Sequence, residues 1–331
     1  MTDSLAIVDT LLLDTPRISQ WMLYDTKGSQ IYEEIVAMKE YYLPAAERAV
    51  IEQNIDDIAT PTHQCNSQVV VELGAGAGHR TLKLIERMAT KATFTEIVPT
   101  DISAEALREN REYYDASPTR GTEDGNSVRY TPLKGTHEAV LSEVATKFAA
   151  DAVRTFMFMG SSLGNYDDSE IIELIGLVKS YMSEHDRLLV AVDLQHSTTK
   201  PSERIVQAYD DPHGITARFT LNALTHVNNV AGLNFEVSKW KHVVEYDKDT
   251  ARIITHVEAL STQSLMKSGS SNELRRFEQG DRIYIEQSRK FSEAKMHQYA
   301  GAVGLNLSRR WSNGDFLIVE LRLPDAVEPA K

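Results

Sequence analysis

The segment from Val69 to Arg80, with the sequence VVVELGAGAGHR, is the feature that most constrains the fold of this chain. It runs from three β-branched residues through an acid into glycines at every second position. The next residues, 81–88, have apolar side chains three and four positions apart, which is typical of a helix. The pattern therefore predicts a strand, a tight turn and a helix, the first βα unit of a doubly wound sheet. Glycine in such a turn allows a positive φ and close approach of a ligand.

Two classes of ligand use this geometry, the dinucleotides and S-adenosylmethionine (SAM). The dinucleotide pattern places its third glycine three positions after the second, whereas here that position is His79 and the glycines are 74, 76 and 78. Glu72, just before the first glycine, fits methyltransferases in which an acid lies near the charged amino-acid end of SAM. An ordinary strand-turn-helix junction with incidental glycines is the alternative interpretation.

A second acid supports binding of adenosine. Residues 94–100 read as a second strand, and Asp101 directly follows it. An acid at the end of the second strand, roughly 20 residues after the glycines, can accept both hydroxyls of a ribose. Asp101 also precedes a predicted helix, where an aspartate can cap the first turn, and both roles can hold at once.

Composition limits the class of protein and its partners. The chain has 331 residues, 42% hydrophobic and 25% charged, which indicates a globular protein of one large or two modest domains. Its single cysteine, Cys65, excludes an internal disulfide and a zinc site built from cysteines, so we expect no metal. A net charge of −13 disfavours nucleic acid and anionic membranes, which leaves a small molecule as the expected partner. Without a basic leader or a long apolar run, a cytoplasmic location is expected; the oligomeric state is left open, and a monomer fits.

The hydrophobic patterns divide the chain into four parts. Residues 1–60 read as helical, 61–197 as a SAM-binding domain, 198–290 as an inserted domain of mainly antiparallel strands, and 291–331 as a helix and a strand that rejoin the first sheet. The segment 118–127 reads as a polar surface loop. The fold class is therefore α/β, a Rossmann-like methyltransferase sheet with an inserted α+β substrate domain. The predicted strands of the first sheet are 69–73, 94–100, 128–132, 154–159 and 187–194, and those of the insertion are 235–246, 250–262 and 280–288.

Separated motifs in one order resemble a single family, the histidine-specific, SAM-dependent N-α-methyltransferases of the ergothioneine pathway, whose fungal relatives methylate tryptophan and its derivatives. The resemblance spans nearly the whole chain. The matching motifs are Tyr24–Ile35 with Glu40-Tyr41-Tyr42, Glu72–Gly76, Gly160–Asn165, Ala208–Asp211 with Gly214, Glu286–Phe291, and Trp311 with Gly314-Asp315-Phe316.

The resemblance implies roles for individual residues. The cofactor-binding positions, taken with the glycine turn, are Glu72, Gly74, Gly76, Arg80, Asp101, Gly135 and Thr136. At 135 and 136 the family more often has an acid followed by an aromatic residue. Asn165 would orient the amino and carboxylate groups of the substrate, and the hydroxyls of Tyr41 and Tyr209 would serve the same end of it. Tyr41 is the residue that we expect to touch the reacting nitrogen, so it and Asn165 are the candidate catalytic residues.

Side-chain recognition is expected at Glu286 and Ser288. They stand at i and i+2 on a predicted strand, so both project from one face. An acid and a hydroxyl there can hold the two nitrogens of an imidazole. Tyr24 would form an aromatic wall for the ring. Near Thr255 the family often has a methionine, so ring recognition here departs from the family pattern.

The leading hypothesis is SAM-dependent α-N-methylation of L-histidine, repeated to give the trimethylated betaine hercynine. Methylation of tryptophan or another aromatic amino acid is the nearest alternative, and an indole, with one N–H, would need only one polar partner. A silent or regulatory SAM-binding protein and a dinucleotide oxidoreductase are more distant alternatives. Asn165, Tyr209 and Glu286 argue against the first of these, and the glycine spacing argues against the second.

Overall fold

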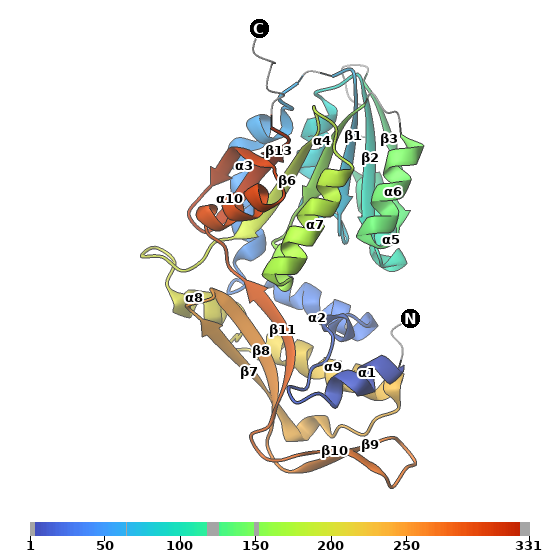
Figure 1. Ribbon diagram of the computed structural model, residues 1–331, viewed down its shortest axis with the longest axis vertical. Helices are drawn as coiled ribbons and strands as arrows, with labels where there is room; N and C mark the ends of the chain where they lie inside the picture. Colours follow the sequence, from blue (N-terminus) through green and yellow to red (C-terminus); the bar gives the residue numbers. More distant parts are fainter. Residues whose placement is uncertain (1–3, 64, 118–125, 149–151, 325–331) are drawn as a thin grey trace. The chain divides into compact units, whose positions relative to one another are not determined.

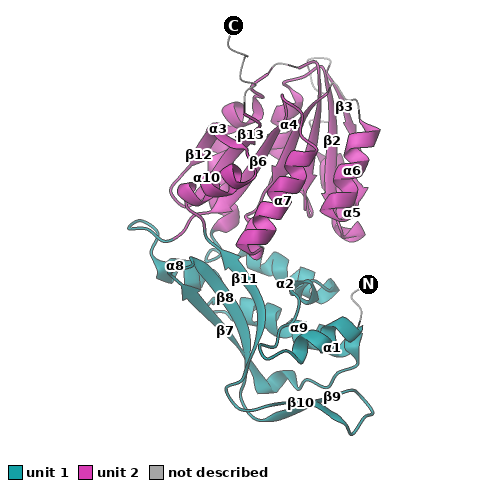
Figure 2. Ribbon diagram, viewed as in Figure 1, with its two compact units in different colours: residues 1–42, 196–290 teal, residues 43–195, 291–331 magenta. Residues whose placement is uncertain are grey.

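A computed structural model describes residues 4–63, 65–117, 126–148 and 152–324 of the chain. Most of the predicted polar loop at 118–127 lies outside the described residues. The chain forms two compact units (Figure 2): residues 43–195 with 291–331 make one, called the sheet unit here, and residues 1–42 with 196–290 make the other, called the inserted unit. The second unit is thus discontinuous in sequence.

The sheet unit contains one mixed sheet of eight strands among the described residues, in the order β12-β13-β6-β5-β1-β2-β3, with β4 beside β2 (Figure 1). The strands β1 to β6 pair in parallel, and β13 runs antiparallel to both β6 and β12. The last strand therefore rejoins the first sheet, as predicted. The strands are β1 (Ser67–Leu73), β2 (Phe94–Asp101), β3 (Ser127–Tyr130), β4 (Leu133–Lys134), β5 (Val153–Phe158), β6 (Arg187–Asp193), β12 (Asn306–Ser312) and β13 (Phe316–Arg322).

Helices cover both faces of this sheet. Val69, Val71 and Leu73 of β1 pack in one apolar cluster with α6 (His137–Lys147), α7 (Asp168–Ser180) and α10 (Glu293–Ala302). Because side chains alternate along a strand, Glu72 points to the opposite face. That face is covered by α4 (Leu82–Ala89) and α5 (Ala104–Ala116), and α3 (Leu43–Ala59) packs against α4 and β13.

The strand order fixes where a ligand can bind. The chain reverses direction across the sheet between β1 and β5, and open α/β sheets bind ligands at the carboxyl ends of the strands at such a switch point. Two loops begin there, the glycine turn after β1 and the loop after β5, which contains the 3₁₀ helix η2 (Ser162–Asn165).

The inserted unit is built around helix α9 (Ile215–Ala231). This helix packs against α1 (Ser4–Leu11), η1 (Gln20–Leu23), α2 (Thr26–Ala37) and the sheet β11-β8-β7. In β8, alternate residues from Ile253 to Ala259 are buried, so one face of this sheet forms the core of the unit. The remaining elements are α8 (Ser202–Gln207), η3 (Val237–Lys239), β7 (Trp240–Asp247), β8 (Arg252–Ala259), β9 (Gln263–Met266), β10 (Glu273–Phe277) and β11 (Arg282–Arg289).

Several elements differ from the sequence prediction. Strand β7 begins at Trp240 instead of 235, because Val237–Lys239 forms a 3₁₀ turn. The hairpin β9-β10 and strand β12 were not predicted; their exposed side chains weaken the alternating pattern. Helix α5 is capped by Ser103, which accepts a hydrogen bond from the Ala106 N–H, and not by Asp101. The helical stretch at 1–60 is divided, with α1 and α2 in the inserted unit and α3 in the sheet unit.

None of the helices in the described part of the chain combines the length and apolarity needed to cross a membrane.

Candidate active site

The glycine turn after β1 has the backbone conformation that its sequence requires. Gly74, Gly76 and Gly78 have φ of +67°, +53° and +77°, which side chains with a Cβ rarely adopt. A Cβ on Gly74 or Gly76 would meet no described atom within 4 Å, so the space beside these two residues is open. At Gly78 a Cβ would come within 2.6 Å of the Asn110 amide. The turn therefore presents bare backbone at the switch point.

Asp101 ties this turn to the end of β2. Its carboxylate accepts hydrogen bonds from the Gly76 N–H (3.1 Å) and the Ser103 N–H (2.8 Å). Each oxygen of a carboxylate can accept a further bond, which is what the two hydroxyls of a ribose require. The predicted neighbours at 135 and 136 lie beside it, since the Gly135 N–H donates to the Asp101 carbonyl at 3.1 Å. Thr136 is exposed and caps α6, so its side chain has a local structural role.

Glu72, predicted to lie near the cofactor, is buried beneath the glycine turn. It is only 4% exposed, accepts a hydrogen bond from the Thr81 hydroxyl (3.0 Å) and lines a small cavity with Asn110 and Tyr130. Burial raises its pKa to about 8, so the side chain is largely protonated at neutral pH. The structure gives Glu72 a supporting role under the turn, and a direct contact with the cofactor stays a prediction.

Arg80 lies at the switch point together with a residue that the sequence analysis missed. Glu47 of α3 is 1% exposed and accepts a hydrogen bond from the Gly160 N–H at 2.7 Å. A Cβ on Gly160 would lie 2.7 Å from the Arg80 guanidinium, so the loop after β5 and Arg80 are in close contact. Burial raises the pKa of Glu47, and the charge of Arg80 opposes that rise. No sequence signal marks Glu47, because only the packing of α3 brings it to this loop.

Asn165 ends the same loop. It is the last residue of η2 and half-buried, and no described residue hydrogen-bonds its side-chain amide. Upstream, Ser161 has a φ of 59°, unusual for a residue with a side chain, and its hydroxyl accepts from the Asp193 N–H at 2.8 Å. The loop is therefore held in a strained conformation at the carboxyl end of β5, as sites often are.

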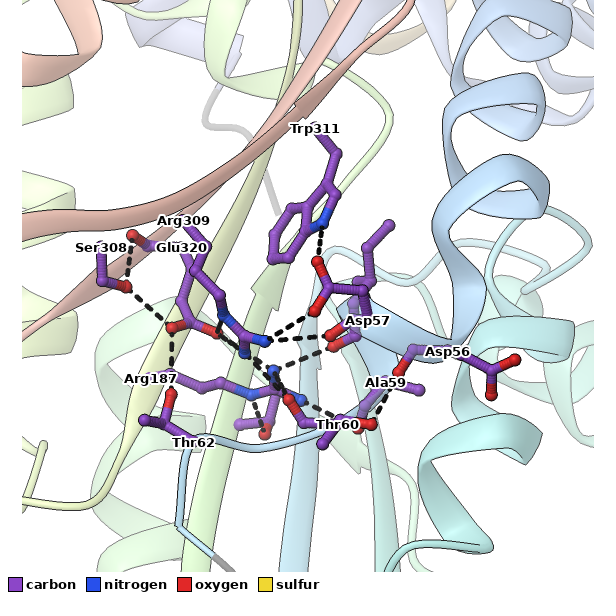
Figure 3. A network of polar contacts seen from close by, with 12 residues as sticks. Asp56, Asp57, Ala59, Thr60, Thr62, Arg187, Ser308, Arg309, Trp311 and Glu320 are labelled. Carbon is purple, nitrogen blue, oxygen red and sulfur yellow. Dashed lines mark hydrogen bonds and ion pairs between the residues drawn. The ribbon is translucent and has the colours of Figure 1, made fainter.

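Helix α3, which carries Glu47, is fixed at its far end by a buried charged network (Figure 3). The Arg187 guanidinium donates to the carbonyls of Ile58 (2.9 Å) and Ala59 (3.3 Å) and pairs with Glu320 at 3.1 Å. Arg309 pairs with the same carboxylate. The network thus satisfies the carbonyl end of a helix, where cations are favoured.

Trp311, one of the family motifs, belongs to this network. Its indole N–H donates to the Asp57 carboxylate at 2.6 Å, and the Arg309 guanidinium lies over its ring. Trp311 therefore holds the end of α3, at a position in the sheet unit far along the chain from the glycine turn.

The inserted unit contains the predicted side-chain site. Register between β11 and β8 is unbroken from Glu286 to Arg289, which places Glu286 and Ser288 on one face, as predicted. Thr255, 2% exposed, is the residue directly opposite Glu286, and Ile253 is opposite Ser288. This is the core-facing side of the sheet. The position where the family often has methionine is thus the immediate neighbour of the acid.

Glu286 has the properties of an acid that binds a ligand. Burial raises its pKa to about 7, and the positive charge of Lys290 opposes that rise. No described residue donates a hydrogen bond to its carboxylate. A half-buried acid without donors among the described residues is costly to a fold and is typical of a binding site.

Ser288 and Tyr209 are joined by a buried lysine. Their hydroxyl oxygens lie 2.9 Å apart, and the Lys290 ammonium donates to both, at 2.7 Å to Tyr209 Oη and 2.9 Å to Ser288 Oγ. Lys290 is 2% exposed. The Tyr209 hydroxyl thus lies beside Ser288, and its predicted contact with the carboxylate end of the substrate stays a prediction. Lys290, which lies directly after the end of β11, was missed by the sequence analysis.

Tyr209 itself is positioned by the segment that follows it. The Asp211 carboxylate accepts from the N–H groups of His213, Ile215 and Thr216, which caps α9. His242 of β7 lies 2.9 Å from the Tyr209 carbonyl. The YDD motif therefore anchors the tyrosine between helix and sheet.

Further tyrosines gather in the inserted unit. The ring of Tyr41 lies edge-on to that of Tyr209, with centroids 5.9 Å apart. Burial, the neighbouring phenols of Tyr32, Tyr209 and Tyr24 and a hydrogen bond with Tyr32 raise the pKa of Tyr41 well above its ordinary value. Tyr24 packs edge-on against Tyr32 and Phe219. Tyr32 was not among the predicted site residues.

The predicted residues thus fall into two groups by unit. Glu72, Gly74, Gly76, Arg80, Asp101, Gly135, Thr136 and Asn165 belong to the sheet unit, and Tyr24, Tyr41, Tyr209, Thr255, Glu286 and Ser288 to the inserted unit. Within the described chain, no cluster of three or more histidine, cysteine or acidic side chains could hold a metal ion.

Comparison with known proteins finds relatives that match most of this chain. The chain is 28% identical to the histidine N-alpha-methyltransferase of Mycobacterium tuberculosis over 295 residues, which cover 88% of this chain and 86% of that protein. The corresponding protein of Mycolicibacterium smegmatis is 26% identical over the same shares. Ergothioneine biosynthesis protein 1 of Schizosaccharomyces pombe is 27% identical over 84% of this chain, which covers 35% of that protein.

The family model described as "Histidine-specific methyltransferase, SAM-dependent" matches residues 3–322. This match spans both units and every residue of the two groups. The chain therefore belongs to the histidine-specific, SAM-dependent methyltransferases and is an N-methyltransferase that uses S-adenosylmethionine.

Proposed function

We propose that this enzyme methylates the α-amine of L-histidine and repeats the transfer to form the trimethylated betaine hercynine. The observation that carries the proposal is the pair Glu286 and Ser288 on one core-facing strand face. A neutral imidazole has one N–H to donate and one nitrogen to accept, and the carboxylate and the hydroxyl match these two needs. The names of the relatives in Mycobacterium and Mycolicibacterium support the same substrate.

The sheet unit fits the cofactor. The turn at Gly74 and Gly76 has open backbone, and Asp101 at the end of β2 offers oxygens to a ribose. We place the carboxylate of the methionine moiety near Arg80, the cation of the turn. When bound, SAM supplies a methyl group on a positively charged sulfur.

Transfer is an in-line displacement in which the amine forms a C–N bond as the C–S bond breaks. Charge moves from sulfur to nitrogen, so positioning contributes most of the rate. The attacking amine must be neutral, and its proton must leave before each round. Because the pKa of Tyr41 is raised, its phenol stays protonated, and we assign it to orient the amine through its oxygen while water takes the proton. Asn165 is assigned to the amino and carboxylate groups of the substrate.

The test is to incubate the protein with SAM and each of the twenty amino acids and to read product masses. We expect histidine to gain one, two and finally three methyl groups, with the fragment pattern of an α-N-methylated amino acid. Methylation of the imidazole instead of the α-amine, or no reaction with histidine, would contradict the proposal.

Tryptophan is the second candidate, and Thr255 is the observation that favours it. Threonine directly opposite Glu286 leaves more room than the methionine common in the family, and an indole is larger than an imidazole. A kcat/KM for tryptophan above that for histidine would decide for this alternative.

A further inference from the structure

We propose that Lys290 is a positioning residue that, with Tyr209, makes Ser288 a hydrogen-bond donor only, so that the enzyme selects the neutral imidazole of histidine and rejects the imidazolium. This inference rests on the proposed function and deepens it. It assigns a role to a buried cation that the methyl-transfer chemistry does not use.

The Lys290 ammonium occupies one of the acceptor sites of Ser288. A hydroxyl oxygen has two lone pairs and one proton. The Lys290 ammonium carries three N–H donors and no acceptor, so its contact of 2.9 Å with Ser288 Oγ must occupy one lone pair. Its contact of 2.7 Å with Tyr209 Oη occupies a lone pair there in the same way.

The hydroxyl oxygens of Tyr209 and Ser288 are 2.9 Å apart, so one of them donates a hydrogen bond to the other. A phenol is a stronger acid than an aliphatic alcohol and is the better donor of the two. Donation from Tyr209 to Ser288 fills the second lone pair of Ser288. Both acceptor sites of Ser288 are then taken, and its own proton is the only group that it can offer to a substrate.

The two nitrogens of the substrate ring would bind Glu286 and Ser288. Glu286 lies two residues before Ser288 on the same face and accepts the ring N–H. The other ring nitrogen must then accept from Ser288, which only the neutral ring can do, because an imidazolium has two donors and no acceptor. The fixed charge of Lys290, close enough to act on Glu286, also disfavours a second cation there.

Other titratable groups lie around this triad, including Asp210 and Asp211, which act on His242, and Tyr24 and Tyr32, which act on Tyr41. Glu286 is on the same strand, Tyr209 follows α8, Tyr41 faces the Tyr209 ring, and His242 of β7 contacts the Tyr209 carbonyl. Glu286 ionises in the range of interest, since its pKa is about 7, and burial lowers the pKa of His242 from its ordinary value. A test must therefore separate the titration of Glu286 from that of the ligand.

Two ligands of the same shape but different ring pKa separate the titration of the ligand from that of Glu286. Histidine has a ring pKa of about 6.5. Its isostere 1,2,4-triazol-3-ylalanine keeps an N–H and an acceptor nitrogen but stays neutral in weak acid. Calorimetric titration of both ligands into the full chain saturated with S-adenosylhomocysteine measures binding without turnover. The ratio of the two affinities cancels the effect of Glu286 protonation on the two neutral rings, which present the same N–H and acceptor nitrogen.

For the unaltered protein we expect the affinity ratio of histidine to the triazole to fall about tenfold between about pH 7.5 and about pH 5.5, as the ring of free histidine is protonated. In Lys290→Met, Ser288 regains an acceptor site and the nearby charge is lost, so the fall should shrink to about twofold. Tyr209→Phe should shrink it too, and it serves if Lys290→Met does not fold. Lys241→Met, which removes an exposed lysine paired with Glu258 on the same sheet, should leave the fall at about tenfold.

A ratio that does not change with pH in the unaltered protein would overturn the inference, and so would an unchanged fall in both Lys290→Met and Tyr209→Phe. A merely structural role for Lys290 would weaken both ligands equally at every pH. If neither ligand binds to the unaltered protein, histidine is not the substrate, and it is the proposed function that fails.

Discussion

The proposed cofactor site of the sheet unit and the proposed side-chain site of the inserted unit consist of different chemical groups. In the sheet unit the turn after β1 offers backbone groups in left-handed conformations, fixed by Asp101 and supported from below by Glu72. In the inserted unit the site consists of side chains, a carboxylate and a hydroxyl with a lysine behind them. Backbone groups are the same in every protein and suit a cofactor shared by many enzymes. Side chains carry the choice of substrate.

The largest effect should come from the acid of the inserted unit. We expect Glu286→Ala to lower kcat/KM for histidine by about 10²–10⁴-fold, because a site built to hydrogen-bond a ring loses its charged partner. Tryptophan should be unaffected or gain, because an indole needs only one polar partner and removal of the acid opens volume for the larger ring. Steady-state kinetics with both amino acids measures this, and SAM affinity serves as the control. Equal losses for both amino acids would show that Glu286 does not set specificity.

The next effect tests what supports the cofactor side. Glu320→Gln leaves the buried Arg187 and the half-buried Arg309 without their carboxylate, and loss of one partner of a buried ion pair such as Arg187–Glu320 costs about 3–5 kcal/mol. Denaturant unfolding should show this loss. Glu278→Gln, which removes an exposed partner of Arg276 in the inserted unit, should change the free energy of unfolding far less, because solvent screens an exposed ion pair. Similar costs for the two variants would mean that the network does not stabilise α3.

Asn165 tests the comparison directly, because it belongs to the sheet unit but is assigned to the amino acid. Asn165→Ala should raise KM for histidine by about tenfold to a hundredfold through the loss of one or two hydrogen bonds to charged groups. SAM affinity should stay within about twofold. A variant that loses SAM instead would place Asn165 with the cofactor residues.

Asp101→Ala should show the opposite selectivity. We expect SAM affinity to fall at least about tenfold, since charge-assisted bonds to the ribose and the bond to the Gly76 N–H are removed. Calorimetric titration with SAM measures this. If the affinity does not change, Asp101 has only the local role of fixing the turn.

The smallest effect concerns Glu72 and appears as a pH dependence of stability. Its pKa is raised to about 8 in the folded chain from an ordinary value near 4.5, so the folded state holds a proton that the unfolded state releases. The stability associated with the protonated acid is therefore complete below about pH 4.5 and is lost as pH rises toward 8. Glu72→Gln keeps the bond to Thr81 without this titration, and its free energy of unfolding should fall less than that of the unaltered protein between about pH 5 and 8. Parallel curves would mean that Glu72 is ionised in the fold.

The two units also differ in how much the sequence predicted. The glycine turn could be predicted because a positive φ is a local requirement, and glycines at 74, 76 and 78 meet it. Glu286 and Ser288 could be placed on one face because strand alternation is local too. Glu47 could not be found, since its contact with Gly160 depends on how a helix from elsewhere in the sequence packs. Lys290 lay in the matched motif, but only the three-dimensional contact with Tyr209 shows its role.

The discontinuity of the units has a consequence for synthesis of the protein. Residues 1–42 leave the ribosome before the whole of residues 43–195, yet they pack with residues 196–290, which follow. At about 5–20 residues per second, α1 and α2 wait on the order of ten seconds or more for helix α9, whose apolar face completes their core. The edge of strand β6 likewise stays unpaired until β13, which pairs with it, has been synthesised. An exposed edge and an uncovered apolar face are the features that lead nascent chains to aggregate. Yield of the folded enzyme should therefore respond to the rate of translation and to chaperones more strongly than the stability of the finished fold would suggest.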